Sequence, residues 1–209
     1  MPKRIIGVSE RLINVAKEEF LSKGFDGASI KEIASKADTS PRAIYTRFAN
    51  KEDLFCKVVG PVVDEFHRMF LEDKDEYFSG KAQECTSDNS QGQFSPTDYY
   101  IRYIEYAYEH KDVFILLLTK AAGTRYEHFS KDLADTDTDR VKEVISAGNI
   151  NVNKNINIDI VYLFIEQITY SFYDNLFVPL LKGCSLKEAK EYITTMVEFY
   201  MNGIEAFSK

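Results

Sequence analysis

The 209-residue chain lacks most features by which secreted proteins and membrane proteins are recognised. Its three cysteines, Cys56, Cys85 and Cys184, are odd in number and far apart, so neither a disulfide framework nor a CxxC motif is available. Its longest apolar runs, VFILLL and IVYLFI, have six residues, whereas a membrane-spanning helix needs roughly 20. No apolar segment follows the first basic residues, so we expect no secretion signal, no membrane association and a cytoplasmic location.

Motifs for catalysis and metal binding are equally scarce. The sequence has no Gly-rich phosphate loop, no GxSxG and no HExxH, and its three histidines are not spaced as metal ligands. The acidic run DLADTDTDR, residues 132–140, fails the calcium-loop test, because the sixth position counted from Asp135 is Arg140 instead of glycine. We interpret the run as a solvated acidic turn or helix start. We therefore predict no enzyme, no catalytic residues, no cofactor and no metal.

The charge of the chain is unevenly distributed. Residues 1–59 hold 11 Lys and Arg against 8 Asp and Glu, a net +3, and residues 60–209 hold 15 against 25, a net −10. A mildly basic head followed by a strongly acidic body is typical of a nucleic-acid-binding N-terminus joined to a domain that does not itself bind DNA.

Apolar periodicity predicts an all-α fold. Residues 9–23 place Leu12, Ala16 and Phe20 on one face, and Gly24 is a natural left-handed cap. Ser29 and Glu32 form an S-x-x-E capping-box pattern at the start of a helix of about nine residues. Further helices are predicted at 41–48, from residue 50 to about 70 or beyond with a kink expected at Gly60-Pro61, and at 96–110, 111–123, 158–181 and 185–207.

Between these helices the pattern weakens. Residues 79–98 have many small polar residues and are predicted to form a loop. A more polar stretch covers 127–147, an Asn-rich interruption follows it, and only short β-branched pieces near residues 150–160 suggest strands. We find no internal repeat.

The segment from residue 29 to 48 predicts a helix-turn-helix, whose second helix enters the major groove. Ser40 is a natural N-cap followed by proline at the first helical position. At 100° per residue, Ile44 and Phe48 point together into the core. The opposite face then carries Arg42, Ala43 and Thr46, with Tyr45 and Arg47 at its sides, which suits base reading and phosphate binding. On periodicity alone, an ordinary solvated helix pair stays an open alternative.

The sequence KGFDGASIKEIASKADTSPRAIYTRFANKEDLF, residues 23–55, resembles the TetR family of bacterial transcriptional regulators. The resemblance lies in the GF-x-x-x-S turn, the IA-containing helix, the Y-x-x-F end of the next helix, and N-K-E-D-L. Two departures stand out. Asp38-Thr39 replaces the usual glycine and apolar residue in the turn, and Asp tolerates left-handed backbone. Pro41-Arg42-Ala43 replaces the frequent Lys-Gly-Thr, so the base preference of relatives does not transfer.

The resemblance implies a three-helix DNA-binding domain at 1–49 and a larger helical domain for ligand binding and dimerisation at 50–209. It assigns phosphate contacts to Ser29, Tyr45 and Lys51, the last at a helix N-terminus. Base contacts fall to Ser40, Arg42, Ala43 and Thr46, with Arg47 beside them. Arm contacts from Lys3, Arg4 and Arg11 are a further possibility. The expected partner is a double-stranded DNA operator.

The last two helices are candidates for a homodimer surface. The helix predicted at 158–181 is apolar on most sides, so it must be buried on two faces. One face would pack on the domain core, and the other would pack against the same helix pair of a second subunit. The alternative is that both faces pack inside a monomer. The stripe of the last helix consists of Leu186, Ala189, Ile193, Met196, Val197, Tyr200, Ile204 and Phe207.

Aromatic side chains in the body suggest a small-molecule site, although an aromatic stripe at helical spacing is more often ordinary core. Glu166 is unusual in its apolar stretch and would face a cationic ligand, pair with a basic residue or point to water. The candidate ligand-binding residues are Tyr103, Tyr106, Phe114, Tyr126, Tyr162, Glu166, Tyr170 and Tyr173.

These patterns lead to two functional hypotheses. The first is a homodimeric repressor released from its operator by a small, mainly apolar or aromatic effector. The effector would shift the population of body conformations and swing the DNA-reading heads through the helix that starts near Lys51. The second is a DNA-organising or protein-docking factor with the same fold and no small-molecule control.

Overall fold

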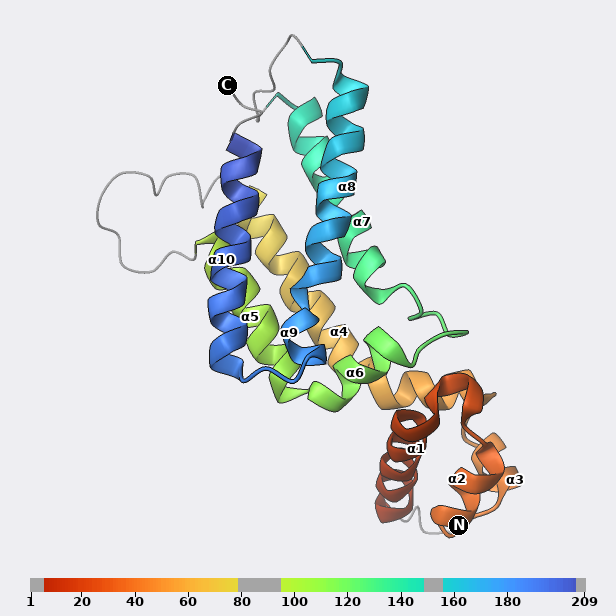
Figure 1. Ribbon diagram of the computed structural model, residues 1–209. Helices are drawn as coiled ribbons and strands as arrows, with labels where there is room; N and C mark the ends of the chain where they lie inside the picture. The colour runs from red at the N-terminus through yellow and green to blue at the C-terminus, as the bar shows by residue number, and fades with distance from the viewer. Residues whose placement is uncertain (1–5, 79–94, 149–155, 206–209) are drawn as a thin grey trace. The chain divides into compact units, whose positions relative to one another are not determined.

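The computed structural model describes residues 6–78, 95–148 and 156–205 (Figure 1). Within these ranges the regular structure is helical and contains no strand, which confirms the predicted all-α class. Residues 79–94 of the loop predicted at 79–98, residues 149–155 of the Asn-rich stretch, and Lys3, Arg4, Cys85 and Phe207 lie outside the described residues, and the last residues of the predicted loop belong to α5. The helices are α1 (Ile6–Gly27), α2 (Ile30–Lys36), α3 (Pro41–Tyr45), α4 (Lys51–Phe78), α5 (Pro96–Glu109), α6 (Lys111–Thr119), α7 (Phe129–Ser146), α8 (Ile158–Leu176), α9 (Val178–Leu181) and α10 (Leu186–Glu205).

These helices form two compact units. The first runs to Glu65 and also contains His110–Phe129, so α6 belongs with α1, α2 and α3. The second contains Phe66–Glu109 and the chain from Ser130 onward. Helix α4 contributes to both units and continues through Gly60 and Pro61. The helix-turn-helix segment lies wholly within the first unit.

The core of the first unit is built from aromatic rings. Leu12, Ala16 and Phe20 are fully buried on one face of α1, as predicted. The ring of Phe20 lies 5.1 Å from that of Phe55, at the start of α4, and 6.1 Å from that of Phe25. Offset and edge-on ring pairs at these separations are favourable beyond their buried area.

Helix α1 ends its regular course at Gly24. This residue has φ 74° and ψ 172°, a conformation open essentially to glycine alone. The positive φ agrees with the predicted cap, while the extended ψ turns the chain so that the Phe25 N–H donates to the Lys120 carbonyl, 2.9 Å away. The end of α1 is thereby bonded to the end of α6.

A buried carboxylate joins α1 to α2. Glu19 is fully buried, and its oxygens lie 2.8 Å from Lys23 Nζ and 2.5 Å from Lys36 Nζ. These hydrogen-bonded lysines lower the pKa of Glu19 from 4.5 to about 2, although burial opposes the change. Lys23 also pairs with Glu32.

That second pairing explains why one predicted cap does not form. Ser29 has the extended backbone of an N-cap residue, but its side chain accepts no capping hydrogen bond, so the predicted capping box is wrong. Glu32 contacts Lys23 instead of reaching back to Ser29. A complete box forms at the start of α10, where Ser185 Oγ accepts from the Glu188 N–H and the Glu188 carboxylate accepts from the Ser185 N–H.

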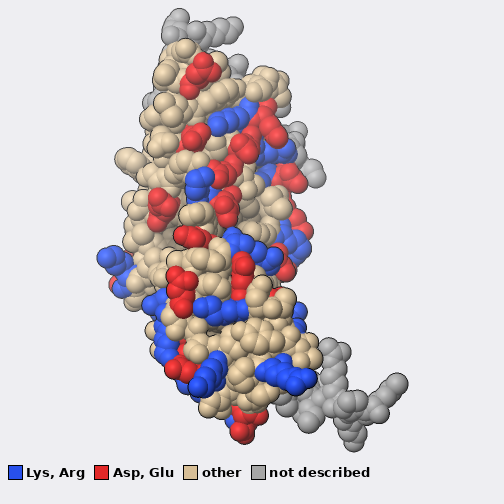
Figure 2. Space-filling model, turned by 90° about the vertical axis from the view of Figure 1, so that its right-hand side faces the viewer, with Lys and Arg blue, Asp and Glu red and all other residues tan. Residues whose placement is uncertain are grey.

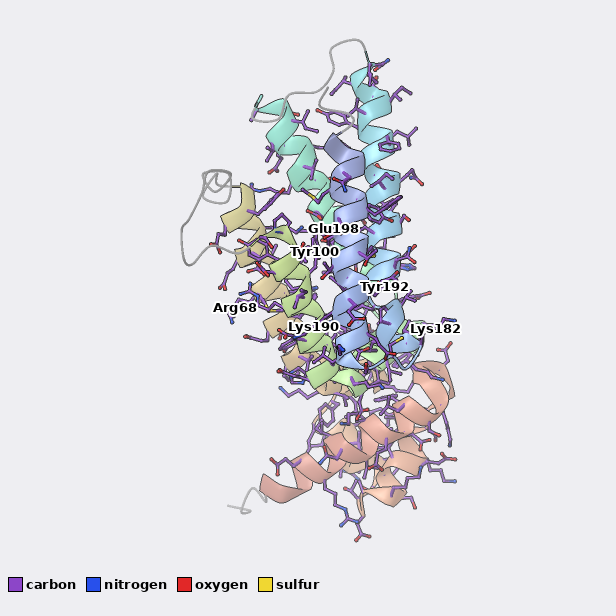
Figure 3. All side chains as sticks on the ribbon, turned by 60° about the vertical axis from the view of Figure 1, so that its left-hand side comes forward. Arg68, Tyr100, Lys182, Lys190, Tyr192 and Glu198 are labelled. Carbon is purple, nitrogen blue, oxygen red and sulfur yellow. The ribbon has the colours of Figure 1, made fainter. Side chains whose placement is uncertain are left out.

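In the second unit, α5 and α10 are the most closely packed pair of helices. Ala189, Ile193, Met196 and Val197 of α10 are buried, so the middle of the predicted apolar stripe packs inside its own unit. Lys190 of α10 forms an ion pair with Glu105 of α5 at the rim of this contact (Figure 3).

The helix predicted at 158–181 is divided. It ends at Leu176, with Phe177 as the C-cap, and the short α9 follows. Pro179 explains the break, because its ring has no N–H to donate and would collide with the carbonyl four residues earlier in a continuous helix. Cys184 N–H bonds to the Pro179 carbonyl as Gly183 turns the chain with φ 75°.

Replacing Glu19 tests the buried ion pairs. We expect Glu19→Gln to lower the free energy of unfolding near neutral pH by about 1–2 kcal/mol, allowing for the partial exposure of both lysines. Because the folded pKa lies below the unfolded one, this advantage of the wild type is present above about pH 4.5 and shrinks as the pH falls toward about 2. Urea unfolding over a pH series measures both effects.

Asp112→Asn is the matched control, because Asp112 pairs with Lys17 at an exposed site of the same unit. Its effect should stay below about 0.5 kcal/mol. An effect of Glu19→Gln that does not change with pH would contradict the role of its charge.

Candidate nucleic-acid interface

The turn between α2 and α3 depends on one unusual backbone conformation. Asp38 has φ 59°, and it is the only described residue other than glycine with positive φ. The sequence predicted that Asp would accept this left-handed position, and the structure confirms it. The Thr39 N–H donates to the Ala34 carbonyl at 2.9 Å, which fixes the chain as it leaves α2.

Helix α3 starts at a well-formed cap. Ser40 has an extended backbone, and its hydroxyl accepts a hydrogen bond from the Ala43 N–H at 3.2 Å, with Pro41 at the first helical position. The regular helix ends at Tyr45, three residues earlier than predicted. Helical backbone bonds nevertheless continue to the N–H of Phe48, which donates to the Ile44 carbonyl at 2.9 Å.

The rotation of α3 is the predicted one. Ile44 is fully buried and Phe48 is partly buried. Arg42, Thr46 and Arg47 are exposed, Ala43 is partly buried, and Tyr45 exposes 54% of its surface. The side chains suited to reading bases and binding phosphates therefore share the solvent side.

The two guanidinium groups of this face have no internal partner. Neither the Arg42 nor the Arg47 guanidinium forms a hydrogen bond or ion pair with another residue in the described part of the chain, although the backbone of both residues is hydrogen-bonded. The Thr46 hydroxyl donates to the Arg42 carbonyl at 2.8 Å. Figure 2 shows acidic and basic side chains intermingled on one face of the molecule instead of a broad patch of one sign. DNA contact by this helix would thus depend on a few positioned cations.

The remaining predicted phosphate ligands lie in the same unit. Ser29 is partly buried at the start of α2. Lys51, at the start of α4, donates to the carbonyls of Asp26 and Ala28 at 3.1 and 3.3 Å and lies 4.5 Å above the Phe25 ring. Through these contacts Lys51 stabilises the end of α1 in this structure. Arg11 is exposed, and its guanidinium lies 3.7 Å from the Asp38 carboxylate.

The candidate ligand-binding residues are divided between the two units. Phe114 and Tyr126 are buried in the first unit, where Tyr126 accepts a hydrogen bond from Arg125 at 2.8 Å. Tyr103 and Tyr173 are buried in the second unit. In the same unit, the centroid of the Tyr106 ring lies 6.1 Å from that of Phe66.

The other three candidates link α8 to α7. Glu166 pairs with Lys142 at 3.2 Å, which decides among the alternatives left open for it. Tyr162 bonds to Ser146 at 3.0 Å, and the Tyr170 hydroxyl donates to Asp135 at 2.5 Å. Long polar side chains therefore connect these two helices.

The second unit also contains a buried polar cluster that the sequence did not reveal. Lys74 of α4 lies 2.9 Å from the Asp137 carboxylate of α7 and donates to the Tyr100 hydroxyl at 3.1 Å. Tyr173 of α8 donates to the same Asp137 oxygen at 2.9 Å. Burial raises the pKa of the Tyr100, Tyr103 and Tyr173 hydroxyls. We call Lys74, Asp137, Tyr100 and Tyr173 the Lys74 cluster.

The cluster corrects one part of the interpretation of residues 132–140 as a solvated acidic turn or helix start. The run lies in α7 with Asp132 in its first turn, and Asp132 and Asp139 are exposed, but Asp137 and Thr138 are buried. One feature of the sequence could have indicated the burial of Asp137 and Thr138: each follows an apolar residue, Leu133 or Ala134, by four positions, which places it on the same helix face. No group of acidic, His or Cys side chains in the described ranges is arranged to hold a metal ion.

None of the helices in the described part of the chain is long and apolar enough to cross a membrane.

Comparison with known proteins assigns the class. Residues 12–58 match the family described as "Bacterial regulatory proteins, tetR family". The chain is also similar to a solved transcriptional regulator of Aquifex aeolicus VF5, with 19% identity, a TM-score of 0.59 and coverage of 92% of this chain and 99% of that one. A putative TetR-family regulator of Mesorhizobium loti has 18% identity and a TM-score of 0.52, with 96% and 98% coverage. The FadR regulator of Bacillus subtilis, solved with stearoyl-CoA, has 14% identity and a TM-score of 0.53, with 92% and 97% coverage.

The helix-turn-helix and its matched segment place the protein among DNA-binding transcription regulators, a class that is not enzymatic. Within that class, residues 12–58 match the tetR family, and the chain has the fold of solved tetR-family regulators along nearly its whole length.

The turn itself provides a stability test. We expect Asp38→Val to lower the free energy of unfolding by about 1–2 kcal/mol, because a β-branched side chain is strained at positive φ. Asp38→Gly should be neutral or mildly stabilising. Chemical denaturation of both variants measures the difference, and equal losses would contradict the importance of the backbone conformation.

Proposed function

We propose that the protein is a homodimeric repressor that reads an operator through the exposed face of α3 and leaves it when a small molecule binds the second unit. The observation that carries the proposal is the pairing of a fully buried Ile44 with exposed, internally unpaired Arg42 and Arg47. A helix of a purely structural pair has no need for two uncompensated guanidinium groups on one side. Guanidinium groups bind phosphates and the O6 and N7 atoms of guanine.

A second subunit is supported by an exposed apolar face. Ile160, Leu163 and Phe164 lie at helical spacing on α8, and Leu163 exposes 55% of its surface. Phe199 on α10 exposes 73%. The Tyr200 hydroxyl donates to Ser171 at 2.9 Å, so the two helices lie side by side, as Figure 3 also shows.

Such a face costs free energy in water, and exposed apolar clusters mark protein interfaces. A twofold axis beside α8 would bury it in a four-helix bundle of two α8–α10 pairs. It would also present two α3 helices to DNA, as symmetric operators require.

Control by a small molecule is supported by the character of the second unit. Its interior combines aromatic rings with a few buried polar groups, which are the kinds of side chain that bind small ligands. The stearoyl-CoA bound to the FadR regulator indicates that this fold accommodates ligands with a large apolar part. A ligand that prefers one conformation of the second unit would shift the population of conformations toward it. Helix α4 extends into both units, so its position would change with that shift.

Arginine substitutions test DNA reading. We expect Arg42→Ala and Arg47→Ala each to weaken binding to DNA flanking the coding region by roughly tenfold or more, because each removes a cation from base or phosphate contact. Fluorescence anisotropy across a salt series measures affinity and salt slope. The thermal stability should not change, because neither guanidinium has an internal partner. Lys31→Ala, an exposed change on α2, is the control. Binding equal to wild type in both arginine variants would contradict the proposed reading face.

Charge placed on α8 tests the dimer. We expect Phe164→Glu and Leu163→Glu to convert the protein from a dimer to a monomer, because a carboxylate would be buried against its symmetric copy. Sedimentation analysis at several concentrations measures the change. Leu71→Glu is the matched control, since Leu71 is an equally exposed apolar residue of α4 outside this face. A wild-type monomer, or a Leu71 variant that dissociates equally, would contradict this dimer surface.

A further inference from the structure

The surroundings of the Lys74 ammonium group are those of a bound organic cation. Lys74 Nζ lies 5.4 Å from the centroid of the Phe70 ring and 5.2 Å from that of Tyr100. The Asp137 carboxylate completes the site at 2.9 Å. Aromatic faces together with one carboxylate are the groups that proteins use to bind ammonium ligands.

We infer that the Lys74 cluster is a cation-binding site that the chain fills with its own lysine, and that an organic cation with an apolar or aromatic body binds there by displacing Lys74. The four residues of the cluster and Phe70 all belong to the second unit, so the site is complete within it.

The two members of the ion pair differ in their freedom to move. Both side chains are largely buried, with 12% of Lys74 and 11% of Asp137 exposed, but Lys74 is long and flexible and its neighbours Asp75 and Glu76 are exposed, so its side chain can turn outward to water. Asp137 has a short side chain in the buried face of α7, and the fully buried Tyr173 hydroxyl donates to it. Displacement therefore removes the cation and leaves the anion in place.

That asymmetry decides the charge of the ligand. A buried carboxylate without a counter-charge is strongly unfavourable, so Asp137 requires another cation once Lys74 leaves. An anionic ligand would have to approach this carboxylate. The site already favours a cation, because burial lowers the pKa of Lys74 whereas Asp137, together with Tyr100, raises it overall.

One hydroxyl group beside the cluster is also available to a ligand. The Tyr103 hydroxyl is buried and has no hydrogen-bond partner in the described structure. The Tyr103 ring lies 5.7 Å from the rings of both Phe70 and Tyr100. Buried polar groups are rarely left unbonded, so this hydroxyl can bond a polar substituent of the ligand.

Direct titration of the full chain tests the site. The probes are benzyltrimethylammonium and phenethylammonium, with phenylpropanoate as the anion of similar size, and the measurement is isothermal calorimetry without DNA. We expect both cations to bind and the anion not to bind. Lys74→Met should bind the cations about tenfold tighter than wild type, because the internal competitor is gone, and Asp137→Asn should lose binding.

Lys142→Met is the matched control, because it removes a lysine of a neighbouring ion pair, with Glu166, and should leave cation affinity unchanged. If Lys74→Met is less stable than wild type, the cations should raise its melting temperature more than that of the wild type. Cation binding that Lys74→Met does not strengthen, or preferential binding of the anion, would overturn the inference.

That this cation is the effector rests on the proposed function, and a second measurement separates the two claims. Release of the protein from DNA by the same cations supports both. Cation binding that leaves the DNA complex intact supports the site and contradicts its role as the effector site.

Discussion

The burial of Ile44 fixes what α3 can do. With this side chain inside the first unit, the helix has only one possible rotation, and Arg42, Tyr45, Thr46 and Arg47 must face solvent. The rest of the unit maintains that position. The Ser40 cap sets where α3 begins, the left-handed Asp38 sets the angle at which the chain enters it, and the aromatic rings of α1 and α4 provide the support behind it.

The second unit reverses the usual distribution of side chains at two places. An apolar face of α8 around Leu163 is exposed, whereas the Lys74–Asp137 ion pair is enclosed by rings. The exposed face is unfavourable for an isolated unit and becomes favourable with a second subunit. The Asp137 carboxylate would be unfavourable alone, and either the internal lysine or a competing cation compensates its charge. The dimer and the cation site therefore rest on the same kind of physical argument.

Local chemistry in the sequence predicted much of the first unit. The rotation of α3, the Ser40 cap and the tolerance of Asp38 for positive φ follow from neighbouring residues alone. The predictions that failed depend on residues distant in the chain. Ser29 forms no capping box because Lys23 engages Glu32. Asp137, expected to be solvated, is buried because α4 brings Lys74 to it. The division near Pro179 was visible in the sequence and was outweighed by apolar periodicity. Whether the predicted DNA and ligand residues make those contacts is a question about partners, which local patterns do not answer.

The account is tested most directly by selecting binding sites for the full-length protein from a pool of random double-stranded DNA. A dimer that reads through α3 should enrich one inverted repeat, with half-site centres about one helical turn apart or a multiple of it. Repeating the selection with Arg42→Ala should change the bases preferred within each half-site. A pool that stays random, or an enriched site without twofold symmetry, would contradict the proposal of a dimeric operator-binding protein.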